Sequence, residues 1–257
     1  MRTQEKHATR FRSIQTSLLF VIVPAVIISM AVLSLMGYLS SKAIIQTSAG
    51  NEMSQCLSVA MGSIEMSLSN NRMVAETMAR GVEAVQRQAV KGEQTASDWD
   101  AAAYQEILTS FVGSNPETFG GGIWFEPYQY RPEQRYFSPY CMRQNGAVTY
   151  VDNYSLGEGV YYTDQDWYTN AANTTQKSVW SAPYYDEFAQ ISMVTSSAPI
   201  YDETGRLLGV ATADIDLTQM QQMVLSLDVV ANGRAFLIDD TGVYIADEDS
   251  EKLLSAN

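Results

Sequence analysis

The stretch SSAPIYDETGRLLGVATADIDL, residues 196–217, decides the fold of this chain. One apolar run ends at Tyr201, a second begins at Leu207, and the residues DETG at 202–205 lie between them. Gly205 can adopt the positive φ angle that a tight turn of this kind requires. The stretch therefore predicts an antiparallel β-hairpin that turns at residues 202–205.

The same turn pattern occurs again near the end of the sequence, where AFLI and VYIA flank DDTG at residues 239–242. Between the two hairpins, the segment LTQMQQMVLSL at residues 217–227 predicts a connecting helix. Two hairpins with one turn chemistry indicate two related sheet modules. We expect the second module to be incomplete at Asn257.

Upstream of the first hairpin, aromatic and β-branched runs bounded by Gly, Pro, Asn or Asp predict further strands from Phe111 onward. These runs are GGGIWFEPY (120–128), RYFSPYCMR (135–143), AVTYVDNY (147–154), SVWSAPYY (178–185) and QISMVTSSAPIY (190–201). Residues 91–103 are typical of a polar connection, in which a helix begins at Ser97 or Asp98.

Two helical segments precede the strands. Residues 41–90 contain no proline, and their apolar residues recur at helical spacing, which predicts a long amphipathic helix. Before it, no charged residue occurs between Arg12 and Lys42, and the segment LLFVIVPAVIISMAVLSLMGY at 18–38 is predominantly apolar. About 20 such residues cross the hydrocarbon core of a bilayer as a helix. The predicted fold class is therefore α+β, with a membrane helix, a long helix, an antiparallel sheet and the start of a second sheet.

The basic residues of the N-terminus predict the orientation in the membrane. Residues 1–12 contain four basic residues and one acidic residue, which favours a cytoplasmic N-terminus. A cleaved signal peptide is the competing interpretation, but its apolar core would be too long and no clear A-x-A site follows. We expect a cytoplasmic segment at 1–12 and a transmembrane helix at 13–40. The long helix with a membrane-distal module follows at 41–228, and a truncated membrane-proximal module at 229–257.

Charge and composition exclude several functions. Residues 13–257 contain 12 basic and 28 acidic residues, a net charge of −16, which disfavours nucleic acid and suits either cationic ligands or solubility. The only histidine is His7, so the main domain has no His-based triad and no His-ligated zinc. Cys56 and Cys141 have no metal-type spacing, and no G-x-S-x-G motif occurs. We expect no enzyme activity, no cofactor and no metal site.

One acidic pair was considered as a metal site. Asp214 and Asp216 are separated by one residue in the stretch ATADIDL. We expect their side chains to point to opposite faces of a strand, which argues against a shared metal ion. We also expect Asp216 to be a strand-end or turn residue.

The ordered motifs of residues 41–257 resemble the double Cache (dCache) sensor domain, an extracytoplasmic PAS-like fold common in bacterial chemoreceptors. The matching segments are GGIWFEPY (121–128), DQDWY (164–168), SAPYYDE (181–187) and the hairpin at 196–217. The segment GRAFLIDDTGVYIAD (233–247) resembles the opening of the membrane-proximal Cache module. The resemblance implies a membrane-distal module that binds a small molecule between a sheet and covering loops.

Amino-acid-binding members of this family carry a tyrosine, then Arg-x-Trp-Tyr, an aspartate after Pro-Tyr, and an aspartate on a late strand. The resemblance assigns these roles to Tyr161 or Tyr162, to Trp167 and Tyr168, to Asp186 and to Asp214. Where the family has its arginine, this sequence has Gln165, which cannot clamp a carboxylate as a guanidinium does.

The same region indicates its ligand chemistry independently of the family. Aromatic rings attract cations, and carboxylates accept charge-assisted hydrogen bonds from an ammonium group. A site with both and without a basic residue suits an amine better than a zwitterion, although about half of these aromatic residues are expected to fill the core. The predicted ligand-binding residues are Tyr161, Asp164, Trp167, Tyr168, Tyr184, Asp186 and Asp214.

The sequence thus predicts the ligand-sensing part of a methyl-accepting chemotaxis-type receptor that binds an amine or amino acid and forms a homodimer. The alternative is the sensor of a membrane histidine kinase or diguanylate cyclase, whose exported part would look the same. The residues after a second membrane helix would decide between the two.

Overall fold

The computed structural model describes residues 14–90, 101–151, 154, 159–227 and 233–254. The chain divides into two compact units, Met1–Gln55 and Cys56–Asn257. Helix α1 (Ile14–Val90) begins in the first unit and ends in the second. The predicted start of a helix at Ser97 or Asp98 lies outside the described residues.

In the first unit, the described residues belong to α1. This helix contains Pro24 and has no acidic residue in its first turn. It is long and apolar enough to cross a membrane, as judged by length and composition. The predicted long helix is therefore present, and it continues without interruption from the apolar segment.

The second unit contains an antiparallel sheet of seven strands in the order β3-β2-β1-β7-β6-β4, with β5 also paired to β6. The strands are β1 (Gly120–Phe125), β2 (Tyr140–Gln144), β3 (Ala147–Val151), β4 (Val179–Trp180), β5 (Tyr184–Asp186), β6 (Ile191–Tyr201) and β7 (Leu207–Asp216). Each of the five runs predicted as strands contributes at least one strand, so the α+β prediction is confirmed.

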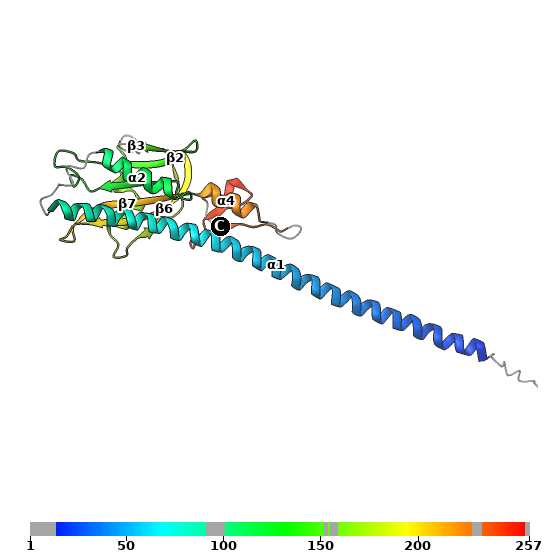
Figure 1. Cartoon of the computed structure of the whole chain (residues 1–257). Coiled ribbons are helices and arrows are strands. Elements are labelled where there is room, and N and C mark those ends of the chain that lie inside the picture. Colours follow the sequence, from blue (N-terminus) through cyan, green and yellow to red (C-terminus); the bar gives the residue numbers. More distant parts are fainter. Residues whose placement is uncertain (1–13, 91–100, 152–153, 155–158, 228–232, 255–257) are drawn as a thin grey trace, which may run out of the picture. The chain divides into compact units, whose positions relative to one another are not determined.

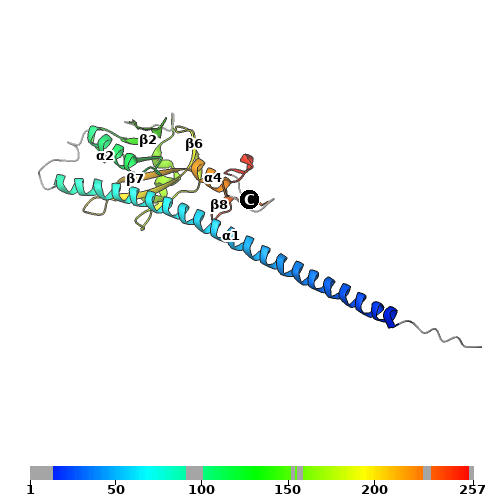
Figure 2. The ribbon, with the colours of Figure 1, turned by 45° about the vertical axis from the view of Figure 1, so that its right-hand side comes forward.

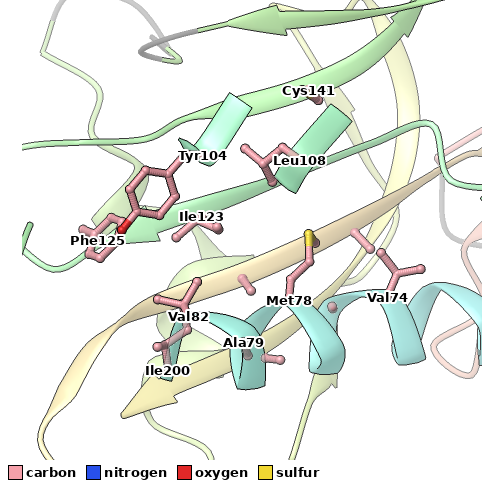
Figure 3. Close-up of a cluster of buried hydrophobic side chains, with 14 of the residues drawn as sticks. Val74, Met78, Ala79, Val82, Tyr104, Leu108, Ile123, Phe125, Cys141 and Ile200 are labelled. Atoms are coloured by element: carbon pink, nitrogen blue, oxygen red, sulfur yellow. The ribbon is translucent and has the colours of Figure 1, made fainter. Parts of the chain in front are cut away.

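One face of the sheet is covered by α1 and by α2 (Ala101–Ser114), as Figures 1 and 2 show. Figure 3 shows Met78 of α1 and Leu108 of α2 beside Ile123 of β1 and Ile200 of β6. All four side chains are fully or almost fully buried. Burial of large aliphatic side chains contributes about 1.5–3 kcal/mol each, so this layer is the main stabilising core of the unit. Helix α2 extends past Phe111, where strands were expected to begin.

The opposite face is covered by α3 (Asp166–Ala172), which packs against β6 and β7. A short 3₁₀ helix, η2 (Tyr162–Asp164), precedes α3. Along β1, Ile123 and Phe125 belong to the α1/α2 core, whereas Trp124 belongs to an aromatic cluster on the α3 side. This alternation is the period of two expected for a strand buried on both faces.

Both predicted hairpin turns are present and share their hydrogen bonds. Asp202 Oδ1 accepts from the backbone N–H and the hydroxyl of Thr204, at 2.8 and 2.7 Å. Asp239 Oδ1 accepts the equivalent pair from Thr241, at 2.9 and 2.8 Å. Each turn ends on a glycine with positive φ, and such Asx-type bonding fixes a tight turn locally. The two copies of this turn pattern in the sequence therefore form turns with the same hydrogen bonds.

The second turn joins β8 (Leu237–Ile238) to β9 (Tyr244–Ala246), a small sheet that is followed by the 3₁₀ helix η3 (Ser250–Lys252). The predicted connecting helix is α4 (Leu217–Leu225), and it packs against β9. Val194, Ile215 and Met220 are buried in a core cluster against which Ile64 of α1 packs.

The expectation that Asp214 and Asp216 point to opposite faces is wrong. Residues two apart on a strand share a face, and the two aspartates pair with Thr195 and Met193, which also lie two apart. The two aspartates differ in their partners, because Asp216 is the N-cap of α4 and its side chain accepts a hydrogen bond from the Thr218 N–H at 2.8 Å. Asp216 is therefore a strand-end residue, as predicted.

We predict that Gly205→Ala lowers the free energy of unfolding by about 1 kcal/mol, because Gly205 has a φ of +83° that a Cβ atom disfavours. The matched control is Gly81→Ala in α1, where an added Cβ meets nothing within 4 Å and alanine favours helix by up to about 1 kcal/mol. Thermal unfolding of both variants measures the difference. Equal melting temperatures would contradict the predicted role of the turn.

Candidate functional site

A small cavity lies between the sheet, α3 and β5 on the face opposite α1 and α2. We call it the inner cavity, and its volume is about 10 Å³, room for one water-sized group. Its lining consists of aromatic rings, two carboxylates, two threonines and a methionine: Trp124, Tyr140, Tyr154, Trp167, Tyr184, Asp186, Met193, Thr195, Thr212 and Asp214. None of these described lining residues is basic.

Asp214 is the most buried charged group of the inner cavity, with 3% of its surface exposed. Tyr140 donates to Asp214 Oδ2 at 2.6 Å, and Thr195 donates to Oδ1 at 2.8 Å. Buried carboxylates require such partners because desolvation without hydrogen bonds is costly. Each carboxylate oxygen of Asp214 therefore accepts a hydrogen bond from another strand. Thr195 lies on the neighbouring strand β6, and Tyr140 lies on β2, one strand beyond β1.

The glycines of β1 make room for this arrangement. Gly120 pairs directly with Asp214, and Gly122 pairs with Tyr140. A Cβ atom at Gly120 would overlap the Tyr140 hydroxyl, and one at Gly122 would lie 2.9 Å from the Tyr140 ring. The run Gly120-Gly121-Gly122 thus lets the tyrosine cross β1 and reach Asp214.

Asp186 is the second buried carboxylate, with 6% of its surface exposed. Its Oδ1 accepts from the Tyr154 hydroxyl at 2.6 Å and from the Ala189 N–H at 2.7 Å. The ring of Phe188 lies 4.4 Å from that of Tyr154. Asp186 therefore joins the turn after β5 to the segment that carries Tyr154.

Three hydroxyl groups of the cavity lining, those of Tyr140, Tyr154 and Thr195, donate to the two carboxylates. Thr195 donates its hydrogen to Asp214, so it accepts from Tyr184, whose oxygen is 2.8 Å away. The Trp124 N–H donates to Thr212 at 2.8 Å. The carboxylates of Asp186 and Asp214 thus offer acceptor oxygens to a ligand, while the hydroxyl donors that reach them bond within the protein.

Aromatic rings surround the same space. Trp124 lies 4.7 Å from Trp167 and 5.3 Å from Tyr154, and Tyr140 lies 4.8 Å from Tyr154, measured between ring centroids. Ring faces attract cations, by up to about 2 kcal/mol when the cation is desolvated. An ammonium group in this cavity would meet both ring faces and carboxylate oxygens.

Burial perturbs the acid–base chemistry of the cavity. Desolvation raises the pKa of Asp214 to about 7, and the nearby charge of Asp186 adds to the rise, while the bonds from Tyr140 and Thr195 oppose it. Burial, followed by the charge of Asp214, raises the pKa of Tyr140 well above 10. Tyr140 therefore stays protonated as a donor at neutral pH, whereas Asp214 exchanges its proton there.

The structure brings together four of the seven predicted site residues. Trp167, Tyr184, Asp186 and Asp214 line the inner cavity. Tyr161, Asp164 and Tyr168 do not line it. The Tyr168 hydroxyl donates to Glu126 at 2.8 Å, and the Tyr161 ring stacks on Tyr136 at 5.1 Å. Tyr162, the other candidate for the leading tyrosine, donates its hydroxyl hydrogen to the carbonyl of Phe125.

Asp164 lines a second, larger cavity beside the first, which we call the outer cavity. Its volume is about 430 Å³, and it shares Trp167 and Tyr184 with the inner cavity. The other lining residues are Asp164, Gln165, Asp166, Asn170, Ser181, Ala182, Pro183 and Tyr185. Gln165, at the position of the family's arginine, therefore faces the outer cavity.

Six lining residues of the inner cavity were missed from the sequence: Trp124, Tyr140, Tyr154, Met193, Thr195 and Thr212. Counting back two residues along the strand from Asp214 would have found Thr212, because residues two apart share a face. The cross-strand neighbours Trp124, Tyr140 and Thr195 depend on register, for which the sequence has no local signal. Across the part of the chain that the structure describes, no group of three or more His, Cys, Asp or Glu residues is arranged to hold a metal ion.

Residues 104–222 match a family model described as "Methyl-accepting chemotaxis protein-like, first PDC sensor domain". The chain is 38% identical over 84 residues to the methyl-accepting chemotaxis protein McpC of Bacillus subtilis, which covers 33% of this chain and 13% of that protein. It is 25% identical over 208 residues to McpA of Pseudomonas putida, which covers 79% of this chain and 31% of that protein. The chain thus spans less than a third of these curated relatives.

Solved sensor domains have the same fold. The ligand-binding domain of the amino acid chemoreceptor PctC of Pseudomonas aeruginosa, in complex with GABA, aligns with a TM-score of 0.56 at 19% identity, covering 80% of this chain and 78% of that one. The sensory domain of the Campylobacter jejuni chemoreceptor Tlp3 aligns with a TM-score of 0.54 at 17% identity, covering 77% and 70%.

We predict that the raised pKa of Asp214 makes the ligand-free fold lose stability as pH rises. The unfolded carboxyl ionises near pH 3.8 and the folded one near pH 7, so its contribution is complete below pH 3.8 and is lost between these values. The unfolding free energy of the wild type relative to Asp214→Asn should fall by roughly 2–4 kcal/mol between pH 4.5 and 7.5. Denaturant melts at both pH values measure this difference. A difference that stays constant with pH would refute the assignment.

The match by sequence covers the strands that line the inner cavity, and solved chemoreceptor sensor domains share the fold of this chain. The resemblance to Cache sensor domains is thereby confirmed. Residues 104–222 of this chain match the model of the first PDC sensor domain of methyl-accepting chemotaxis protein-like receptors.

Proposed function

We propose that this chain is the extracytoplasmic ligand-sensing part of a transmembrane chemoreceptor of the methyl-accepting type, and that it binds a small amine in the inner cavity. The predicted site residues Trp167, Tyr184, Asp186 and Asp214 hold the amine. The observation that carries the proposal is the polarity of the cavity: two buried carboxylates within an aromatic cage, whose surrounding hydroxyl hydrogens are already committed.

This polarity favours a ligand that donates hydrogen bonds. An ammonium group has three donors and a positive charge, and both suit Asp186 and Asp214. A ligand carboxylate would meet two negative charges, and no described lining residue of the inner cavity is basic. A neutral ligand would leave the buried carboxylates without a counter-ion, which is unfavourable whenever they are ionised.

The neighbours bind amino acids, as their names state: PctC is an amino acid chemoreceptor in complex with GABA, and one Tlp3 structure contains 4-methylisoleucine. This chain differs at the position where amino-acid-binding relatives carry an arginine, because Gln165 lines the outer cavity instead. The missing guanidinium supports an amine over an α-amino acid.

The curated relatives reported above favour a chemoreceptor over a histidine kinase, since both are methyl-accepting chemotaxis proteins. Extracellular domains of histidine kinases are among the solved neighbours, for example with a TM-score of 0.51 at 23% identity, which reflects the shared fold. In the proposed receptor, ligand binding stabilises one of two states of α1, which passes the change to the membrane.

The exposed side of α1 supports the proposed homodimer. Val59, Met66 and Met73 follow one another at a spacing of seven residues, and 72, 62 and 61% of their surfaces are exposed. Apolar residues at this spacing form one stripe along a helix, as they do in two-stranded coiled coils. A second copy anchored in the same membrane with the same orientation would bring an equal stripe alongside.

We predict that small primary amines raise the melting temperature of the purified chain in lipid nanodiscs, and that α-amino acids of similar size do so less or not at all. Calorimetry on the same samples gives the dissociation constants. Tight binding of amino acids with amines inert would overturn the proposed ligand class.

The site is tested by a pair of matched variants. Asp214→Asn removes the buried charge and should weaken amine binding by roughly 10- to 150-fold, since charged hydrogen bonds are worth about 1.5–3 kcal/mol. Asp216→Asn makes the same change two residues along the chain at a helix cap, where asparagine also caps well, and should bind normally. Equal loss in both variants would show that Asp214 has no special role.

We predict that Met66→Cys and Met73→Cys, each in a Cys56→Ser background, form disulfide-linked dimers when membranes are oxidised. Glu65→Cys is the control, because residue 65 lies about 100° around the helix from residue 66. Non-reducing electrophoresis measures the cross-linked fraction. Cross-linking that is equal at positions 65 and 66 would contradict the proposed interface.

A further inference from the structure

The outer cavity is not explained by a ligand that only fills the inner one. The inner cavity has a volume of about 10 Å³, whereas the outer cavity has about 430 Å³, and Trp167 and Tyr184 line both. A group the size of an ammonium ion fits the first, but a carbon skeleton attached to it does not. Any larger amine must therefore extend past the shared aromatic walls into the outer cavity.

The chemistry of the outer cavity indicates what the far end of such a ligand carries. Its lining contains Asp164 and Asp166, together with the neutral polar residues Gln165, Asn170 and Ser181. No described residue of this lining is basic, and neither aspartate has an ion pair among those found in the described residues. The outer lining is thus as acidic as the inner one.

Four carboxylates line the two cavities, which share two aromatic walls. Asp186 and Asp214 lie at the buried end, and Asp164 and Asp166 lie at the exposed end. A buried carboxylate pair without a counter-ion is unfavourable, and Asp186 is more than nine-tenths buried; among the described residues, Tyr154 and Ala189 donate to its Oδ1. One ammonium group would compensate the inner pair only, and a second positive charge would complement the acidic outer lining.

We infer that the two cavities form one elongated site for a linear dication, an α,ω-diamine or a longer polyamine. One ammonium group is buried between Asp186 and Asp214, the chain passes between Trp167 and Tyr184, and the second ammonium group lies beside Asp164 and Asp166. The inference rests on the proposed amine-sensing function and specifies its ligand class. It also gives Asp164 a role, since that predicted site residue does not reach the inner cavity.

The test compares α,ω-diamines with monoamines of equal carbon number, by calorimetry on the whole chain in nanodiscs at pH 7.5. The best diamine should bind about three- to thirtyfold more tightly than its matched monoamine, as two partly exposed ion pairs contribute. The double variant Asp164→Asn/Asp166→Asn should lose this advantage and bind the monoamine as the wild type does. The matched control Glu106→Gln/Glu203→Gln removes two exposed charges outside both cavities and should retain the advantage.

A charge reversal provides a second, independent measurement. Asp164→Lys should turn the preference toward an ω-amino acid of the same length, because a cation then faces the far end of the ligand. Melting temperatures near that of the wild type verify that the variants fold. If monoamines bind and diamines gain nothing, or if the control variant loses the advantage equally, the inference is wrong and the proposed function stands. If neither class binds, the proposed function itself fails.

Discussion

The hydrogen bonds that converge on Asp214 are the constraint on which the rest of this face depends. A carboxylate with 3% of its surface exposed persists only because Tyr140 and Thr195 donate to it. Tyr140 reaches Asp214 only because β1 has no side chains at Gly120 and Gly122. An apolar residue at position 214 would remove the need for all of these features, so they are costly for stability and fit the binding role that we propose for this face.

The two faces of the sheet differ in composition: one face forms the apolar core, and the other lines the inner cavity. Toward α1 and α2, the sheet presents Ile123, Ala211 and Ile200 in an ordinary apolar core. Toward α3, the same strands present Trp124, Thr212 and Thr195 around the carboxylates. Because the side chains of a strand alternate, a change on the ligand side is separated from α1 by one strand thickness. The sheet is therefore well placed to couple the site to the helix.

Most of the fold was predictable because its signals are local. The Asp-x-Thr-Gly turns carry their hydrogen bonds within five residues, so Gly205 and Gly242 identify both hairpins from the sequence. The site was predictable only in part. Tyr140 lines the cavity because of strand register, and Tyr154 lines it because of the long connection after β3. Trp167 and Tyr168 illustrate the limit: consecutive residues on a helix point about 100° apart, so one lines the cavity while the other bonds Glu126. The error about Asp216 had a different origin, because residues two apart on a strand share a face.

The small size of the inner cavity has a consequence for the time course of sensing. With room for one water-sized group, it admits more of a ligand than an ammonium group only when a wall such as Trp167 moves aside. The opening frequency then limits association, which becomes slower than diffusional encounter. The fraction of occupied sites consequently follows the ligand concentration averaged over many encounters. Changes in concentration that are shorter than the opening interval do not alter this fraction. A small aromatic site thus acts as a low-pass filter on the concentration of the ligand that we propose for it.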